Sequence, residues 1–397
     1  MNNTRGATLL LLWTRAALAI AGVPASCAAP GSDSGGVSLS EACVWEDFDA
    51  AVERFSRVLQ FETVSDVSAP NHAARPEEFA RLDAFLRAAY PRVFGALTVE
   101  KTGADALSYL LTWTGSDPAL RPVLLVSHTD VVPVTPESIK DWTHPPFSGA
   151  VADGFIWGRG AMDVKVTVVA ILEAAEALLG RGWWPTRTLL FAFGHDEEVG
   201  GAMGAVETAR LLESRGVQLE VIWDEGSGIL LDGVKPFMDI PVALVGTAEK
   251  GYQSAKLHVT STGGHSSMPP IDGSSVGAVV GRLLTRLSAS PPPPRLVSPV
   301  TDMLRGLAPY APAWMAAVLS AVGRVPGVDA LVARLMASAS AEAAALTRTT
   351  AAVTRLSAGV ADNVLPQSAT IGVNLRTLPG DGPGEVLDYL TGVVGPR

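Results

Sequence analysis

The stretch from Pro122 to Asp130 reads Pro-Val-Leu-Leu-Val-Ser-His-Thr-Asp. Its four consecutive apolar residues are typical of a strand buried on both faces, as in a parallel sheet covered by helices. The polar residues that follow would lie just past the carboxyl end of that strand. Ligands bind at this edge in open sheets of this kind. The stretch therefore predicts a strand that delivers His128 and Asp130 to a functional edge.

Two further apolar runs have the same form. Leu189–Phe193 leads into Gly-His-Asp-Glu-Glu at 194–198, and Leu219–Trp223 leads into Asp-Glu-Gly at 224–226. Because helical patterns separate these buried strands, we expect an α/β fold with a mainly parallel sheet flanked by helices. The helices expected around this sheet are 46–59, 76–90, 164–180 and 202–215.

The pattern changes near residue 248. Apolar and polar residues alternate over 255–260, 349–356 and 368–375, which predicts half-exposed strands. An Ala/Leu-rich region at 303–346 has helical composition. We therefore expect a first domain over 45–247, followed by an inserted α+β domain over 248–397 that serves as a lid or dimerisation domain.

Composition narrows the classes of function. The chain has 397 residues with 48% apolar and 18% charged residues, enough for packed cores in two or three domains. The net charge is −10 and no Lys/Arg cluster occurs, which argues against nucleic acid as a partner. The two cysteines, Cys27 and Cys43, form no Cys-x-x-Cys pair, which excludes a thiolate zinc site. Any metal must be held by histidine and carboxylate groups.

The first 28 residues have the form of a targeting segment. Arg5 precedes apolar runs at 7–13 and 16–23, and small residues follow at 25–29. This order is typical of a secretory signal peptide. Arg15 interrupts the apolar core, so a membrane-anchor segment stays open as the alternative. Either reading predicts the secretory pathway, with the protein secreted or in a vacuolar or endomembrane lumen.

Potential metal ligands follow all three apolar strands, and Asp163 adds a fourth from the glycine-flanked loop 158–165. Hydrolytic zinc sites use histidine and carboxylate ligands, and two ions form a clamp for a water and a carbonyl oxygen. We expect Asp163 to bridge two zinc ions. His128 and Asp224 would bind the first ion, and Glu198 the second. Cobalt or manganese would suit the same donors.

Glu197 is the predicted general base. It adjoins Glu198, and adjacent side chains cannot both point at one ion. Glu197 would take a proton from the water between the ions and pass it to the leaving nitrogen. Asp130 is expected to accept the second N–H of the His128 imidazole. An isolated acidic triplet such as 196–198 is usually a solvated turn, so its combination with the other strand ends is what favours a site.

Five segments together resemble the M20 family of co-catalytic zinc metallopeptidases. They are Ser-His-Thr-Asp at 127–130, Pro-Pro-Phe-Ser-Gly at 145–149, Trp-Gly-Arg-Gly-Ala-Met-Asp-Val-Lys at 157–165, Gly-His-Asp-Glu-Glu-Val-Gly-Gly at 194–201 and Gly-Gly-His-Ser-Ser at 263–267. Thr-Thr at 349–350, Asp-Asn-Val-Leu-Pro at 362–366 and Asn-Leu-Arg at 374–376 are similar to the carboxypeptidase S and N-acyl-amino-acid hydrolase branch. The resemblance runs from about residue 46 to 397. It implies a hydrolase that cleaves the amide bond of a C-terminal peptide residue or of an N-acyl amino acid.

The resemblance also implies roles for three residues of the lid. His265 would help to polarise the scissile carbonyl, often from the partner subunit of a homodimer formed through the lid. Asn363 and Arg376 would grip the free carboxylate of the substrate, and arginine suits this because it forms bidentate pairs with carboxylates. Taken singly, each of these residues is at least as typical of an exposed polar position.

The chain departs from the family pattern at its end. The family completes the second metal site with a late histidine, whereas no histidine follows His265 here. We therefore expect the last lid strand and the closing part of the catalytic domain to be missing. The alternative function is a catalytically impaired member of the fold that acts as a dimerising or binding protein. A solute-binding protein with two α/β lobes is a third reading, which gives the acidic run 196–198 no purpose.

Overall fold

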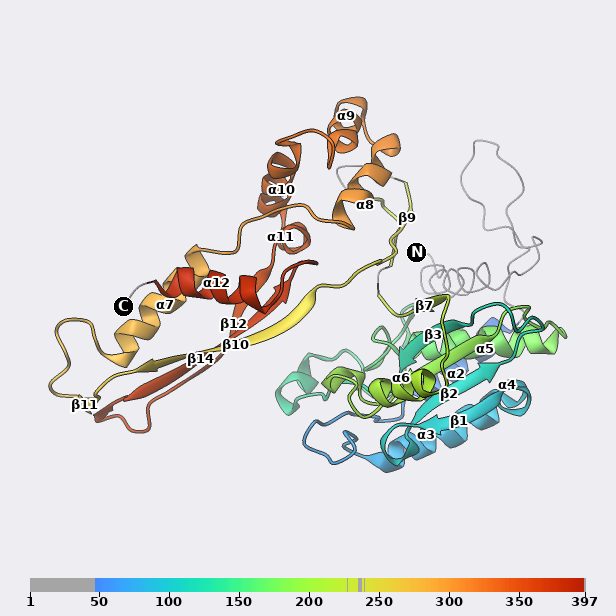
Figure 1. The fold of residues 1–397 in the computed structure, drawn as a ribbon. Helices are drawn as coiled ribbons and strands as arrows, with labels where there is room; N and C mark the ends of the chain where they lie inside the picture. The colour runs from blue at the N-terminus through green and yellow to red at the C-terminus, as the bar shows by residue number, and fades with distance from the viewer. Residues whose placement is uncertain (1–46, 227, 235–237, 239, 396–397) are drawn as a thin grey trace. The chain divides into compact units, whose positions relative to one another are not determined.

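The computed structural model describes residues 47–226, 228–234, 238 and 240–395. They belong to two compact units, divided between Glu225 and Gly226 (Figure 1). The targeting segment expected over 1–28 lies outside the described residues. Among the helices that are described, none is both long and apolar enough to cross a membrane.

The first unit is built on a five-stranded sheet with the order β1-β2-β6-β3-β7. Its strands are β1 (Thr98–Thr102), β2 (Ser108–Trp113), β3 (Val123–His128), β6 (Leu189–Gly194) and β7 (Val221–Trp223). β3 pairs in parallel with β6 and β7, while β2 is antiparallel to β1 and β6. Since β1 and β6 both oppose β2, four of the five strands point the same way, which confirms a mainly parallel sheet.

Helices cover both faces of this sheet (Figure 1). One face packs against α2 to α5 in a large apolar cluster that includes Trp113 and Leu172. The other face contributes Leu110, Leu124 and Leu190, which pack against Leu212 of α6. Each fully buried Leu or Phe side chain stabilises the fold by about 1.5–3 kcal/mol. The helices are α2 (Phe48–Leu59), α3 (Pro76–Ala89), α4 (Pro91–Ala96), α5 (Lys165–Gly180) and α6 (Ala205–Ser214).

The register of the parallel strands brings three strand ends to one edge. His128 lies opposite Gly194 of β6, and Leu125 lies opposite Trp223 of β7. The central strand of the three is β3, so the chain segments after β6 and β7 flank His128 on either side. β7 was expected to be buried, but Ile222 is 57% exposed because β7 lies at the sheet edge with a single neighbour.

Short elements make up the connections of the first unit. They are the 3-10 turns η3 (Ala104–Ala106), η4 (Pro136–Asp141) and η5 (Glu197–Val199) and the hairpin of β4 (Val151–Ala152) and β5 (Phe155–Ile156). The turn η5 follows β6 directly and carries two of the acids expected in the site.

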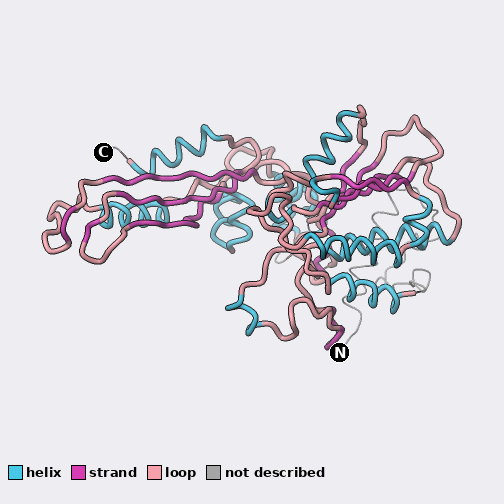
Figure 2. The backbone as a smooth tube through the Cα atoms, turned by 90° about the horizontal axis from the view of Figure 1, so that it is seen from below, coloured by secondary structure: helices cyan, strands magenta, loops and turns pink. Residues whose placement is uncertain are grey.

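The second unit contains a three-stranded antiparallel sheet with the order β10-β14-β12, whose long strands run side by side (Figure 2). Two helices pack on one face of it, against alternate residues of β14 such as Ile371 and Val373. Arg376 has the opposite parity and therefore projects from the other face. These elements are β10 (Gly251–Thr260), β12 (Thr350–Ala358), β14 (Ser368–Thr377), α7 (Val276–Ala289) and α12 (Pro383–Val394).

A second apolar cluster in this unit explains where the chain divides. Met238, with Val234 and Val242, packs against Leu304 of α8 and Leu319 of α9. Residues just after 225 therefore belong to the second unit, whereas the sequence pattern placed the boundary at 247. The remaining elements are α8 (Val300–Leu307), η6 (Ala308–Tyr310), α9 (Ala313–Ala321), α10 (Val328–Ala339), α11 (Ala341–Thr347), the pair β8 (Ile229–Leu230) and β9 (Val242–Ala243), and the pair β11 (Gly264–His265) and β13 (Val364–Leu365).

Candidate metal centre

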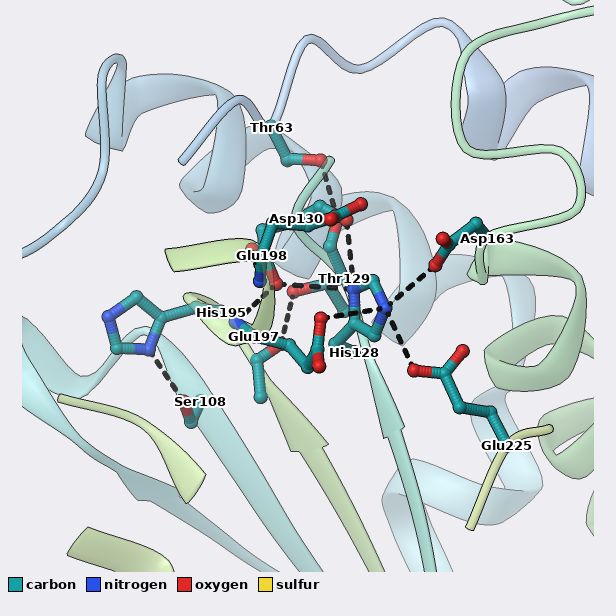
Figure 3. A network of polar contacts seen from close by, with 11 residues as sticks. Thr63, Ser108, His128, Thr129, Asp130, Asp163, His195, Glu197, Glu198 and Glu225 are labelled. Atoms are coloured by element: carbon teal, nitrogen blue, oxygen red, sulfur yellow. Dashed lines mark hydrogen bonds and ion pairs between the residues drawn. The ribbon is translucent and has the colours of Figure 1, made fainter. Parts of the chain in front are cut away.

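His128 is the last residue of β3 and is 1% exposed. Its Nδ1 lies 3.0 Å from the backbone oxygen and 3.3 Å from a carboxylate oxygen of Asp130. Its Nε2 faces three carboxylates, at 3.2 Å from Asp163, 3.4 Å from Glu225 and 3.7 Å from Glu197 (Figure 3). A single nitrogen at the end of the central strand is thus surrounded by negative charge.

The donor set of His128, Asp163 and Glu225 fits a divalent metal. One ligand atom from each residue lies within 4.8 Å of the others. Burial by itself would lower the pKa of His128, but hydrogen bonds to Asp130 and Glu225, together with their charges, raise it to about 11. The surroundings of Nε2 therefore favour a positive charge strongly. Imidazole and carboxylate groups are zinc ligands. A zinc ion held by these residues would supply the positive charge that the surroundings of Nε2 favour.

The loop that carries Asp163 is fixed by a tight turn at Gly160 and by the buried side chain of Lys165. Gly160 has φ +82°, and a Cβ there would approach Val131 to 2.5 Å, so the turn requires glycine. Lys165 is fully buried, and its Nζ donates to the backbone oxygen of Phe61 at 2.7 Å. Burial lowers the pKa of Lys165 to about 7. Apart from its contact with His128, the side chain of Asp163 is 67% exposed, so its carboxylate is accessible to a metal ion.

The turn that carries Glu197 and Glu198 is fixed by Asp130. The two carboxylate oxygens of Asp130 accept the backbone N–H groups of Glu197 and Glu198, both at 3.1 Å. Asp130 therefore contacts the imidazole and the turn at once. Burial raises the pKa of Glu197 to about 7. Burial also raises the pKa of Glu198, and the Asp163 carboxylate raises it further.

Glu225 faces the imidazole of His128, whereas the sequence predicts Asp224 as the ligand at this position, and the role of Asp224 stays a prediction. Asp224 turns its carboxylate back to the N–H of Glu225, at 2.8 Å. β7 ends at Trp223, and of the two acids that follow it, Glu225 brings a carboxylate oxygen to 3.4 Å from Nε2. Desolvation of its carboxylate raises the pKa of Asp224, and the neighbouring charge of Glu225 raises it further.

The three residues expected from the lid all lie in the second unit. His265 pairs with Val364, next to Asn363, and the N–H of Ser266 donates to the backbone oxygen of Asn363 at 3.1 Å. Arg376 lies near the other end of β14, with its guanidinium 4.7 Å from the ring centre of Tyr252. The strand from Ser368 to Arg376 is roughly 26 Å long, at a rise of about 3.3 Å per residue. His265 and Asn363 are therefore together, and Arg376 is remote from both.

Several residues that shape the site gave no sequence signal. Lys165 and Thr63 act through backbone oxygens far along the chain, and Thr63 Oγ1 donates to the backbone oxygen of Thr129 at 2.6 Å. His195 belongs to the motif at 194–201, and its Nδ1 lies 2.6 Å from Ser108 Oγ, a contact that the motif does not indicate. For Glu225 the sequence does contain a signal. Two adjacent acids, Asp224 and Glu225, follow the strand, and either of them could face the metal centre.

The chain matches the model of "Peptidase family M20/M25/M40" over residues 124–369. It is 37% identical over 353 residues to the probable carboxypeptidase S-like 2 of Dictyostelium discoideum, which covers 86% of this chain and 64% of that protein. It is 36% identical to the N-fatty-acyl-amino acid synthase/hydrolase PM20D1 of Mus musculus, over 88% of this chain and 67% of that protein. Carboxypeptidase S of Saccharomyces cerevisiae is 33% identical, over 83% of this chain and 58% of that protein. The chain thus spans about two thirds of the length of the curated relatives it matches.

Two solved structures share the fold. The M20 family metallo-carboxypeptidase Sso-CP2 from Sulfolobus solfataricus aligns with a TM-score of 0.54 and 17% identity, over 88% of this chain and 75% of that one. Human carnosine dipeptidase 1 aligns with a TM-score of 0.54 and 15% identity, over 87% of this chain and 73% of that one. The family and the branch expected from the motifs are confirmed by the family model and by the curated relatives. The chain belongs to peptidase family M20/M25/M40.

Proposed function

We propose that this chain is a metal-dependent hydrolase, which cleaves the amide bond of a C-terminal peptide residue or of an N-acyl amino acid. The observation that carries the proposal is the position of His128 Nε2, which faces the carboxylates of Asp163, Glu225 and Glu197 within 3.7 Å. The names of the relatives support the reaction, since a carboxypeptidase and an N-acyl-amino acid hydrolase both cleave an amide beside a free carboxylate.

We infer that the cofactor is a pair of zinc ions. His128 and Glu225 would hold one ion and Glu198 the other, with Asp163 shared, because a carboxylate has two oxygens to offer. Zinc in such a site polarises a carbonyl oxygen and lowers the pKa of water. Cobalt or manganese could occupy the same donors. Asp130 would keep the imidazole oriented, because it contacts Nδ1 from the protein side.

We propose that Glu197 moves the proton. It follows β6 directly, and its carboxylate is half exposed at the edge where Asp163 and Glu225 also lie. Its pKa of about 7 suits a group that must accept and then donate a proton near neutrality. Glu197 would take a proton from the attacking water and deliver it to the leaving nitrogen.

Arg376 is the group proposed to bind the free carboxylate of the substrate. Its guanidinium lies against the face of Tyr252, and this cation–π contact restricts its orientation. The amide and the carboxylate of one amino acid lie only a few bonds apart. Arg376 is separated from Ser368, at the start of β14, by roughly 26 Å of strand, and Asn363 precedes that start in the chain. A homodimer would resolve this separation, with His265 and Asn363 supplied by a second copy.

A pair of substrates tests the role of Arg376 and the reaction together. We expect the zinc-loaded chain to release the amino acid from an N-acyl amino acid and to act poorly on the same compound with its carboxylate converted to an amide. Arg376→Ala should raise KM for the acid about 10- to 100-fold, because a charge-assisted hydrogen bond is lost. KM for the neutral amide should change little.

The readout is amino acid release over a range of concentrations of both compounds. An exposed cation elsewhere on the second unit, Arg282, supplies the control substitution, Arg282→Ala. Equal effects of Arg376→Ala on the acid and on the amide would contradict carboxylate binding by Arg376. Absence of amino acid release from the zinc-loaded chain would contradict the proposed function itself.

A further inference from the structure

His72 lies in the loop between α2 and α3, and its backbone is held in an unusual conformation. Its φ is +57°, a region that few residues other than glycine adopt, although asparagine, aspartate and histidine are enriched there. Its N–H donates to the Ala69 oxygen at 3.0 Å, and its own oxygen accepts the Asp66 N–H at 2.9 Å. The side chain of the preceding residue, Asn71, donates to Asp105 at 2.8 Å. These hydrogen bonds hold the backbone of the loop at His72, from which the imidazole projects.

The imidazole of His72 contacts Asp196, which is completely buried. His72 Nδ1 lies 2.8 Å from Asp196 Oδ2, and the contact requires a hydrogen on Nδ1 because a carboxylate only accepts. The same oxygen accepts the N–H of Met203 at 2.8 Å. Oδ1 of Asp196 has no hydrogen-bond partner within the described part of the chain. In that part of the chain, His72 alone forms an ion-pair contact with this buried carboxylate.

Asp196 shapes the turn that carries Glu197. Its backbone oxygen accepts the N–H groups of Val199 at 3.2 Å and Gly201 at 2.8 Å, which closes the turn. The residue before it is tied to the same loop, since His195 Nε2 lies 3.1 Å from the backbone oxygen of Asn71. The loop at 71–72 therefore touches both residues that precede the base, whereas Asp130 contacts the backbone of Glu197 and Glu198.

We propose that His72 is a positioning residue of the hydrolytic site, which holds the turn 196–201 through Asp196 so that Glu197 and Glu198 face the metal centre. The effect of His72 on catalysis rests on the proposed function. The positioning itself is a property of the fold. A buried carboxylate without its donor would relax toward other partners or solvent, and the turn would relax with it.

Two substitutions at His72 distinguish the effect of its hydrogen-bond donor from the effect of its backbone conformation. His72→Asn keeps a nitrogen donor on the γ atom and tolerates the positive φ, whereas His72→Gly tolerates the φ but has no donor. Hydrogen exchange of the amides at 197–203 should be about tenfold faster in His72→Gly than in the unmodified chain, with exchange in β3 and β6 unchanged. His72→Asn should exchange as slowly as the unmodified chain. His258→Ala, in the second unit, is the control for loss of a histidine.

Kinetics give the second readout. In zinc-saturated protein, His72→Gly should lower kcat about 10- to 100-fold with little change in KM, and His72→Asn should restore most of kcat. Unchanged exchange at 197–203 in His72→Gly would overturn the proposal. So would acceleration spread evenly over the whole unit, or a His72→Asn variant that exchanges as fast as His72→Gly. If the unmodified chain shows no turnover, the proposed function fails, while hydrogen exchange still tests the contact.

Discussion

Glu197→Gln should lower kcat about 100- to 10,000-fold while the protein keeps its metal. Glutamine has nearly the size of glutamate and can keep the turn at 197–199, but it cannot accept a proton at neutral pH. The N–H of residue 197 would still donate to Asp130, so the backbone of the turn should not move. Turnover and metal content per chain are measured on the same zinc-loaded preparation.

A matched substitution controls for the loss of one negative charge. Glu213 is exposed on α6, and Glu213→Gln should leave both kcat and metal content unchanged. If Glu197→Gln retained near-normal turnover, Glu197 would not be the base. If it lost the metal instead, Glu197 would be a ligand, in keeping with its 3.7 Å distance from His128 Nε2.

Asp163→Asn should abolish metal binding at zinc concentrations that saturate the unmodified chain. Groups that only hold a ligand in place change metal affinity about 10- to 100-fold, so loss of a shared ligand should exceed the upper end of that range. Turnover should fall to background for the same reason. Equilibrium dialysis with elemental analysis gives the affinity. Added zinc should raise the melting temperature of the unmodified chain and not that of Asp163→Asn, because a ligand stabilises only a protein that binds it.

Asp224→Asn is the informative comparison for Asp163→Asn, because it makes the same chemical change one residue away from Glu225. The Asp224 carboxylate accepts the Glu225 N–H, so the variant should keep most of the metal affinity. A loss comparable to that of Asp163→Asn would place Asp224, and not Glu225, at the ion. Normal zinc binding by Asp163→Asn would remove Asp163 from the metal centre.

Most of the first unit follows from the sequence because buried parallel strands are encoded locally. The apolar runs at 123–126 and 189–193 set two strands, and parallel register then brings His128 and the acids after β6 to one edge. The antiparallel direction of β2 did not follow, because a strand's own residues do not encode the direction of its neighbours. The exposure of β7 was not predicted, although Glu220 interrupts the apolar residues of Leu219–Trp223 and a charged residue is typical of an edge strand.

The choice between Asp224 and Glu225 shows where local pattern ends. Both residues are acids just past a strand. If the strand ended one residue earlier or later, the two side chains would exchange directions, and the other acid would face His128. The contacts of Lys165 and His72 are also invisible locally. Lys165 Nζ reaches Phe61, 104 positions away, and His72 reaches Asp196, 124 positions away. Such contacts depend on the tertiary fold and leave no spacing motif.

The position of a bound cation tests the central claim most directly. Crystals of the zinc-loaded chain, with diffraction data collected on both sides of the zinc absorption edge, would locate the ions by their anomalous signal. We expect a peak about 2.0–2.1 Å from His128 Nε2, with Asp163 and Glu225 oxygens completing its ligands. A zinc-loaded crystal with no peak at His128, or with its peaks only at other residues, would contradict the metal centre proposed for this chain.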